Sequence, residues 1–79
     1  MSMTNEAVAE LIRTQFPDAK ITVTGDGYKY HAEVISIIFE GVSKVKRHQL
    51  VYRTVAEAIS SGEVHALTIT ALTPHEAST

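Results

Sequence analysis

The sequence predicts a small α+β domain in which helices cover one face of a three-stranded mixed sheet, with the elements in the order α-β-β-α-α-β. Three patterns support this prediction: apolar residues at helical spacing near the N-terminus, two alternating segments joined by glycines, and a long amphipathic stretch that precedes a last alternating segment. A chain of 79 residues has room for a single domain, which we place at residues 1–79.

The first helix is predicted from apolar residues that recur at helical spacing, namely Val8, Leu11, Ile12 and Phe16. Thr4 can cap its N-terminus, where the negative charge of Glu6 also suits the helix dipole. Pro17 ends the helix, because a proline disfavours helical geometry in the residue before it.

Two strands and a tight hairpin follow this helix. Residues 20–24 and 29–35 alternate between apolar and polar side chains, as expected for strands with one buried face. The segment Gly25-Asp26-Gly27 joins them, and its glycines can adopt the positive φ of a short turn. The two strands are therefore expected to pair antiparallel.

A long helix is predicted from Lys44 to about Ser60, with Ser43 as its N-cap and Gly62 in the left-handed capping position beyond its end. A short helical turn at 36–40 precedes it. Together they make a crossover long enough to bring the third strand parallel to the second.

At about 100° per residue, the apolar side of the long helix forms one arc that we expect to be buried: Val45, His48, Val51, Tyr52, Val55 and Ile59. Lys46, Gln49 and Arg53 point the other way. His48 thus lies in the apolar stripe, where it is expected to pack between helix and sheet; a role at a partner surface is the alternative.

The third strand is predicted at 64–72, with His65 on the same face as Leu67 and Ile69. Thr73-Pro74 ends this strand. The tail 76–79 offers nothing to pack, which allows it to be disordered.

Composition excludes several classes of protein. The chain has no cysteine, so disulfides, thiolate metal sites and thiol catalysis are ruled out. A formal net charge of −2 argues against bulk coating of nucleic acid, and the absence of a signal peptide or long apolar run indicates a cytoplasmic protein. No serine is accompanied by an organised histidine and carboxylate, so no enzyme site is predicted.

Several landmarks, taken in order, resemble the BolA family: Thr-Gly-Asp-Gly at the hairpin, Phe39-Glu40-Gly41, the Val-Lys-Arg-His-Gln-Leu-Val-Tyr block at 45–52, Val-His-Ala-Leu at 64–67, and Thr73-Pro74. The short hairpin is similar to that of the IbaG branch. The resemblance implies a class II KH-like fold and a non-enzymatic adaptor in iron–sulfur cluster trafficking or iron homeostasis. Its implied partner is a monothiol glutaredoxin, with which it would share a 2Fe-2S cluster that also involves glutathione.

The resemblance also implies which residues would hold that cluster. His65 matches the family's ligand position in the Val-His-Ala-Leu segment. Family members that ligate a cluster typically add a histidine or cysteine from the hairpin loop, where this chain has Asp26. His31 is the nearest imidazole but belongs to the second strand, where it is expected at the surface. Asp26 and His31 are therefore weak candidates for the second ligand.

The family has also been interpreted as DNA-binding regulators that use a helix-turn-helix around Gly41. In this chain the cations that could contact phosphates are Lys44, Lys46, Arg47 and Arg53. They are spread around the predicted helix, and the Gly-x-x-Gly clamp of KH domains is missing. A transcriptional regulator and a plain interaction module remain the alternatives to the iron–sulfur adaptor.

Overall fold

The computed structural model describes residues 2–79 and has an α+β architecture. Its elements are α1 (Asn5–Arg13), β1 (Lys20–Gly25), β2 (Lys29–Ile35), the 3-10 turn η1 (Ile37–Phe39), α2 (Lys44–Ser60), β3 (Ala66–Leu72) and α3 (Pro74–Ala77). The sheet order is β1-β2-β3, with β2 antiparallel to β1 and parallel to β3. The predicted α+β fold and its mixed sheet are confirmed.

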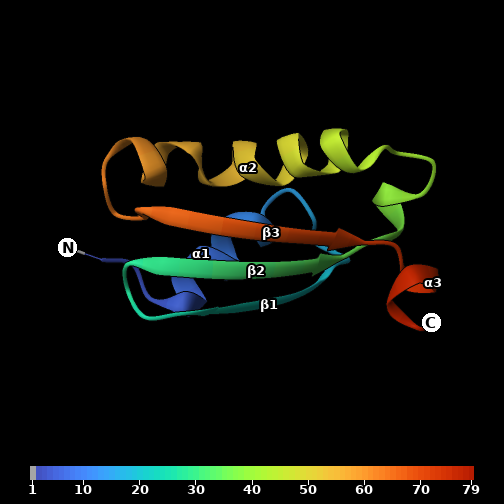
Figure 1. The fold of residues 1–79 in the computed structure, drawn as a ribbon, viewed down its shortest axis with the longest axis horizontal. Helices are drawn as coiled ribbons and strands as arrows, with labels where there is room; N and C mark the ends of the chain where they lie inside the picture. Colours follow the sequence, from blue (N-terminus) through green and yellow to red (C-terminus); the bar gives the residue numbers. More distant parts are fainter. Residues whose placement is uncertain (1) are drawn as a thin grey trace.

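One face of the sheet carries the core. Tyr30, Ala32 and Val34 of the central strand are buried, whereas His31 between them is exposed. In Figure 1, α2 runs along β3 and α1 lies behind the sheet, and residues of both helices join the same core cluster. Within residues 2–79, no helix combines the length and the apolar character that crossing a bilayer requires.

The ends of α2 follow the expected local signals. The Oγ of Ser43 accepts a hydrogen bond from the N–H of Lys46 at 3.2 Å, which satisfies one free donor of the first turn. Gly62 lies beyond the last turn with a φ of +85°, a conformation that side chains with a Cβ rarely adopt. Both boundaries of the helix are therefore set by neighbours in the sequence.

The orientation of α2 about its own axis differs from the prediction. Val45 is 70% exposed and Tyr52 is 41% exposed, and His48 is also exposed, so the arc that was expected to be buried faces outward in part. Arg47, only 6% exposed, takes the interior position above Val51. The hydropathy pattern missed this because it counts an arginine as a surface residue, although a fully hydrogen-bonded guanidinium can be buried.

The guanidinium of Arg47 joins three parts of the fold. Its Nε donates to the carbonyl of Val42 at 2.8 Å, and its Nη1 donates to the carbonyl of Ala71 at 3.1 Å. Nη1 and Nη2 also reach the Glu76 carboxylate, at 2.6 and 3.3 Å. Arg47 thereby links the start of α2 to the end of β3 and to α3.

Glu76 is held from a second direction. Its Oε1 accepts from the Thr73 N–H at 2.9 Å, and its own N–H donates to the Thr73 Oγ1 at 3.1 Å, which makes a reciprocal capping box. The Arg47 hydrogen bonds, followed by that of the Thr73 N–H, lower the pKa of Glu76 to about 2. The short helix α3 is therefore fixed to the body of the domain, and the expectation that the tail from residue 76 has nothing to pack against was wrong for Glu76.

Candidate functional site

His65 lies at one end of the sheet, just before β3 begins. The β1–β2 hairpin and the loop from α2 to β3 meet at this end (Figure 1). The third strand was predicted to start at Val64, but Val64 is fully buried and its N–H donates to the Ala58 carbonyl at 3.0 Å, so it belongs to the loop. His65 is exposed, whereas Leu67, with which it was expected to share a face, is half-buried.

The hairpin loop contacts His65 through Tyr28. The two rings are stacked, with their centroids 4.5 Å apart and an interplanar angle of 20°. The N–H of Ala66 donates to the Tyr28 carbonyl at 3.3 Å, so the hairpin loop is also joined to the first residue of β3. Tyr28 is 56% exposed, and the pair therefore presents the His65 imidazole at the surface of the domain.

Asp26 organises the same loop. Its Oδ1 accepts hydrogen bonds from the N–H groups of Tyr28 at 2.9 Å and Lys29 at 2.8 Å. These bonds, first that of Lys29 and then that of Tyr28, hold the pKa of Asp26 below its ordinary value. One carboxylate oxygen of Asp26 is thus committed to the turn, and the group is ionised at neutral pH.

His31 lies apart from this end of the sheet. It is opposite Thr68 in the register of β2 and β3, and its Nε2 is 3.3 Å from the Oγ1 of Thr70. Thr68 is three residues beyond His65, a separation of about 10 Å along an extended chain. The predicted surface position of His31 is confirmed, and the structure brings Asp26, but not His31, to the loop that contacts His65.

The donor set at this end can be compared with what a metal requires. Within residues 2–79, no group of three or more histidine, cysteine, aspartate or glutamate side chains is placed to hold a metal ion. His65 offers one imidazole, which suits a borderline or soft metal, and Asp26 offers one harder carboxylate oxygen. These residues fit a contribution to a metal group shared with another molecule, and they do not fit a resident metal site.

Tyr28 was not singled out by the sequence analysis. It lies between the Gly-Asp-Gly turn and β2, two residues before the buried Tyr30. The available signal was its spacing, because position 28 continues the two-residue period of the buried face of β2.

The basic residues of α2 do not form one surface. Lys44, Lys46 and Arg53 are exposed, whereas Arg47 is buried against Glu76 and is not available to phosphates. The expectation that Arg47 would join a nucleic-acid contact was therefore wrong. Its guanidinium is already neutralised inside the domain.

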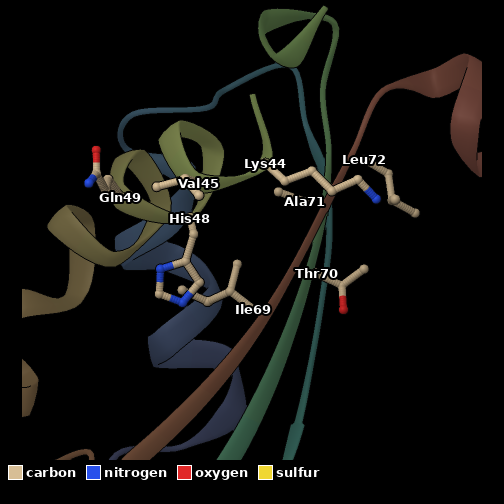
Figure 2. Close-up of a pocket in the computed structure, with 8 residues that line it drawn as sticks. All are labelled: Lys44, Val45, His48, Gln49, Ile69, Thr70, Ala71 and Leu72. Carbon is tan, nitrogen blue, oxygen red and sulfur yellow. The ribbon is translucent and has the colours of Figure 1, made fainter. Parts of the chain in front are cut away.

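His48 lies at a groove between the first turns of α2 and strand β3 (Figure 2). The groove encloses about 640 Å³ and is lined by Lys44, Val45, His48 and Gln49 on the helix and by 69–72 on the strand. The His48 ring stacks on Tyr52 with centroids 6.2 Å apart. The expectation that His48 packs inside the domain was wrong; its alternative, a place on a partner surface, is compatible with this exposed position.

The sequence of this chain is similar to those of known proteins. A family model described as BolA-like protein matches residues 5–76. The chain is 40% identical over 74 residues to an uncharacterized protein from the rpoN-murA intergenic region of Acinetobacter guillouiae, covering 94% of this chain and 89% of that protein. It is 31% identical over 74 residues to the acid stress protein IbaG of Escherichia coli K12, covering 94% of this chain and 88% of IbaG.

A solved structure shows the same arrangement. A BolA protein homologue from Coxiella burnetii superposes with a TM-score of 0.84 at 28% sequence identity, covering 98% of this chain and 99% of that one. The fold and the exposed imidazole define a small α+β domain that presents a metal-competent side chain at the end of its sheet. The chain belongs to the BolA-like protein family.

Proposed function

We propose that this chain is a non-enzymatic, cytoplasmic adaptor that binds a monothiol glutaredoxin and takes part in 2Fe-2S cluster trafficking or iron homeostasis. Membership of the BolA-like family supports this proposal. The observation that carries it at the level of residues is the exposed His65 imidazole, stacked on Tyr28 at the hairpin end of the sheet.

The chemistry of the chain limits what it can contribute to such a cluster. A 2Fe-2S cluster is usually held by four thiolates, and imidazole can replace some of them. Because the chain contains no cysteine, its share must be nitrogen or oxygen, and the sulfur ligands must come from the glutaredoxin and its glutathione. The cluster is thus cargo that the two proteins would share.

Within this proposal the residues have unequal roles. His65 is the ligand, because its ring is exposed at the hairpin end of the sheet, stacked on Tyr28. Asp26 is a weak second candidate, since its Oδ1 is occupied by two N–H groups and a carboxylate is a poor match for an iron–sulfur cluster. His31 is weaker still, since β2 holds it away from the hairpin end.

The test is a spectroscopic titration of this chain with a cluster-loaded glutaredoxin. We expect the visible absorption and circular dichroism of the cluster to change on mixing, and His65→Ala to reduce this change and to accelerate cluster loss. His75→Ala is the matched control, because His75 is an equally exposed histidine on α3. Identical spectra and lifetimes for His65→Ala and the parent chain would remove His65 from the proposal.

A DNA-binding regulator is the second candidate, because Lys44 and Lys46 are both exposed in the first turn of α2. A helix N-terminus with nearby cations can contact phosphates. The test is binding to duplex DNA at low salt, and a parent protein that fails to bind there ends this alternative.

A further inference from the structure

We propose that Tyr28 is a positioning residue for His65, and that Asp26 acts on the site through the turn that holds Tyr28. This inference rests on the proposed role of His65 as a cluster ligand and extends it to the residues that orient the ligand. It follows from three contacts that form a continuous chain from Asp26 through Tyr28 to His65.

The first contact fixes the backbone of Tyr28 at its N–H. This group donates to the Asp26 Oδ1 at 2.9 Å, and the same oxygen accepts from Lys29 at 2.8 Å. The turn is closed again by the Asp26 N–H, which donates to the Lys29 carbonyl at 3.2 Å. Such a side-chain acceptor replaces a backbone partner and defines the shape of the turn.

The second contact fixes Tyr28 at its carbonyl, which accepts from the Ala66 N–H at 3.3 Å. Both polar groups of the Tyr28 backbone are therefore occupied, one inside the hairpin and one by the first residue of β3. Tyr28 is thus held in place, although 56% of its surface is exposed.

The third contact, the stack of Tyr28 on His65, restricts the orientation of the His65 ring. His65 lies outside β3, so no strand pairing restrains it directly. The Tyr28 ring stacks on one face of the imidazole at a centroid distance of 4.5 Å, whereas a metal bound by a ring nitrogen lies in the plane of the imidazole. A ligand whose orientation is set in advance loses less freedom on binding, and such supporting contacts commonly change metal affinity by about 10–100-fold.

This arrangement also explains the exposure of Tyr28. The buried core contains Phe16, Phe39 and Tyr30, and Tyr28 is not a member of it. Because the Tyr28 ring is largely in solvent, its burial contributes little to the stability of the fold. We therefore assign to the turn the role of holding this ring against the imidazole.

Tyr28→Phe keeps the ring and Tyr28→Leu removes it. Asp26→Asn keeps the acceptor oxygen of the turn and Asp26→Ala removes it. Tyr52→Leu is the matched control in the free protein, since Tyr52 forms the other exposed tyrosine–histidine stack.

The first measurement is made on the free protein by NMR. We expect the side-chain couplings of His65 to report one dominant rotamer in the parent, Tyr28→Phe, Asp26→Asn and Tyr52→Leu. Averaged couplings and loss of the ring-current shift are expected in Tyr28→Leu and Asp26→Ala, with the dispersed amide spectrum of the fold preserved. An unchanged His65 rotamer in Tyr28→Leu overturns the inference, whether or not a cluster is bound.

The second measurement is the lifetime of the cluster shared with a glutaredoxin. We expect Tyr28→Leu and Asp26→Ala to shorten it about tenfold, with Tyr28→Phe and Asp26→Asn close to the parent. A short lifetime in Asp26→Asn would instead identify the carboxylate as a ligand and overturn the role given to Asp26. If His65→Ala shortens the lifetime and Tyr28→Leu does not, the inference fails while the proposed function stands; if His65→Ala has no effect, the ligand role itself fails.

Discussion

Arg47 and Glu76 form a two-pronged ion pair between α2 and α3, with Nη1 2.6 Å from Oε1 and Nη2 3.3 Å from Oε2. The arginine is buried, and its remaining donors satisfy the carbonyls of Val42 and Ala71. A single side chain thus joins the loop before α2, the end of β3 and the C-terminal helix.

Replacing Arg47 with alanine should lower the free energy of unfolding by about 2–4 kcal/mol, because a buried side chain is removed and the carbonyls of Val42 and Ala71 lose its N–H donors. Urea unfolding monitored by circular dichroism measures this loss. Arg53→Ala, an exposed arginine of the same helix, should change stability by less than about 0.5 kcal/mol. Equal effects of the two substitutions would contradict the burial of Arg47.

The Glu76 carboxylate should make stability depend on pH in the acid range. Its pKa is about 2 in the folded protein and 4.5 as its ordinary value, so the folded state favours the charged form. The contribution is fully present above pH 4.5 and is lost as the pH falls through the window down to about 2. In Glu76→Gln this part of the pH dependence should disappear, so the free energies of unfolding of the two proteins should converge near pH 2, separate between pH 2 and 4.5, and differ by a constant amount above pH 4.5. A constant difference across that window would show that the pair does not form.

The orientation of α2 can be tested with two valines. Val51 is fully buried and Val45 is 70% exposed. We expect Val51→Ala to cost about 2–3 kcal/mol and Val45→Ala to change the free energy of unfolding by less than about 0.5 kcal/mol. Similar losses of about 2–3 kcal/mol for both substitutions, measured by chemical denaturation, would instead support the predicted arc, in which both valines are buried.

The position of His31 leads to a negative prediction for the cluster. His31→Ala should leave the lifetime of the shared cluster nearly unchanged, because His31 lies in mid-strand beside Thr70 and not at the hairpin end. The lifetime is followed by the decay of visible absorption, with His65→Ala as the positive control. Rapid cluster loss in His31→Ala, with its circular dichroism preserved, would identify His31 as the second ligand.

If Lys44 and Lys46 contact DNA phosphates, changing both to glutamine should flatten the salt dependence of DNA affinity by about two units in a log-log plot. Arg47 should add nothing further to this slope, because its guanidinium is paired with Glu76. Fluorescence anisotropy across a salt series measures the slope.

Much of the fold could be predicted because its signals are local. Ser43 and Gly62 bound α2 through contacts within a few residues, and the alternation at 29–35 is sufficient to predict β2 and its buried face. The start of β3 was predicted two residues too early, at Val64, because the N–H of Val64 is hydrogen-bonded to Ala58 near the end of α2, and a strand pattern does not record such a bond.

The sequence by itself determined the order of the helices and strands up to β3 and the hairpin turn, since each depends on near neighbours or on a local motif. Only the tertiary structure decided that Arg47 enters the core in place of Val45, and that Tyr28 stacks on His65. Both outcomes depend on residues far apart in the chain. Arg47 can be buried because Glu76 lies beside α2 in the folded protein, and Tyr28 stacks on His65 because the hairpin contacts the segment after α2. Whether a charged side chain is buried, and which way a side chain points, depend on such long-range contacts. The hydropathy pattern of a single segment does not contain this information.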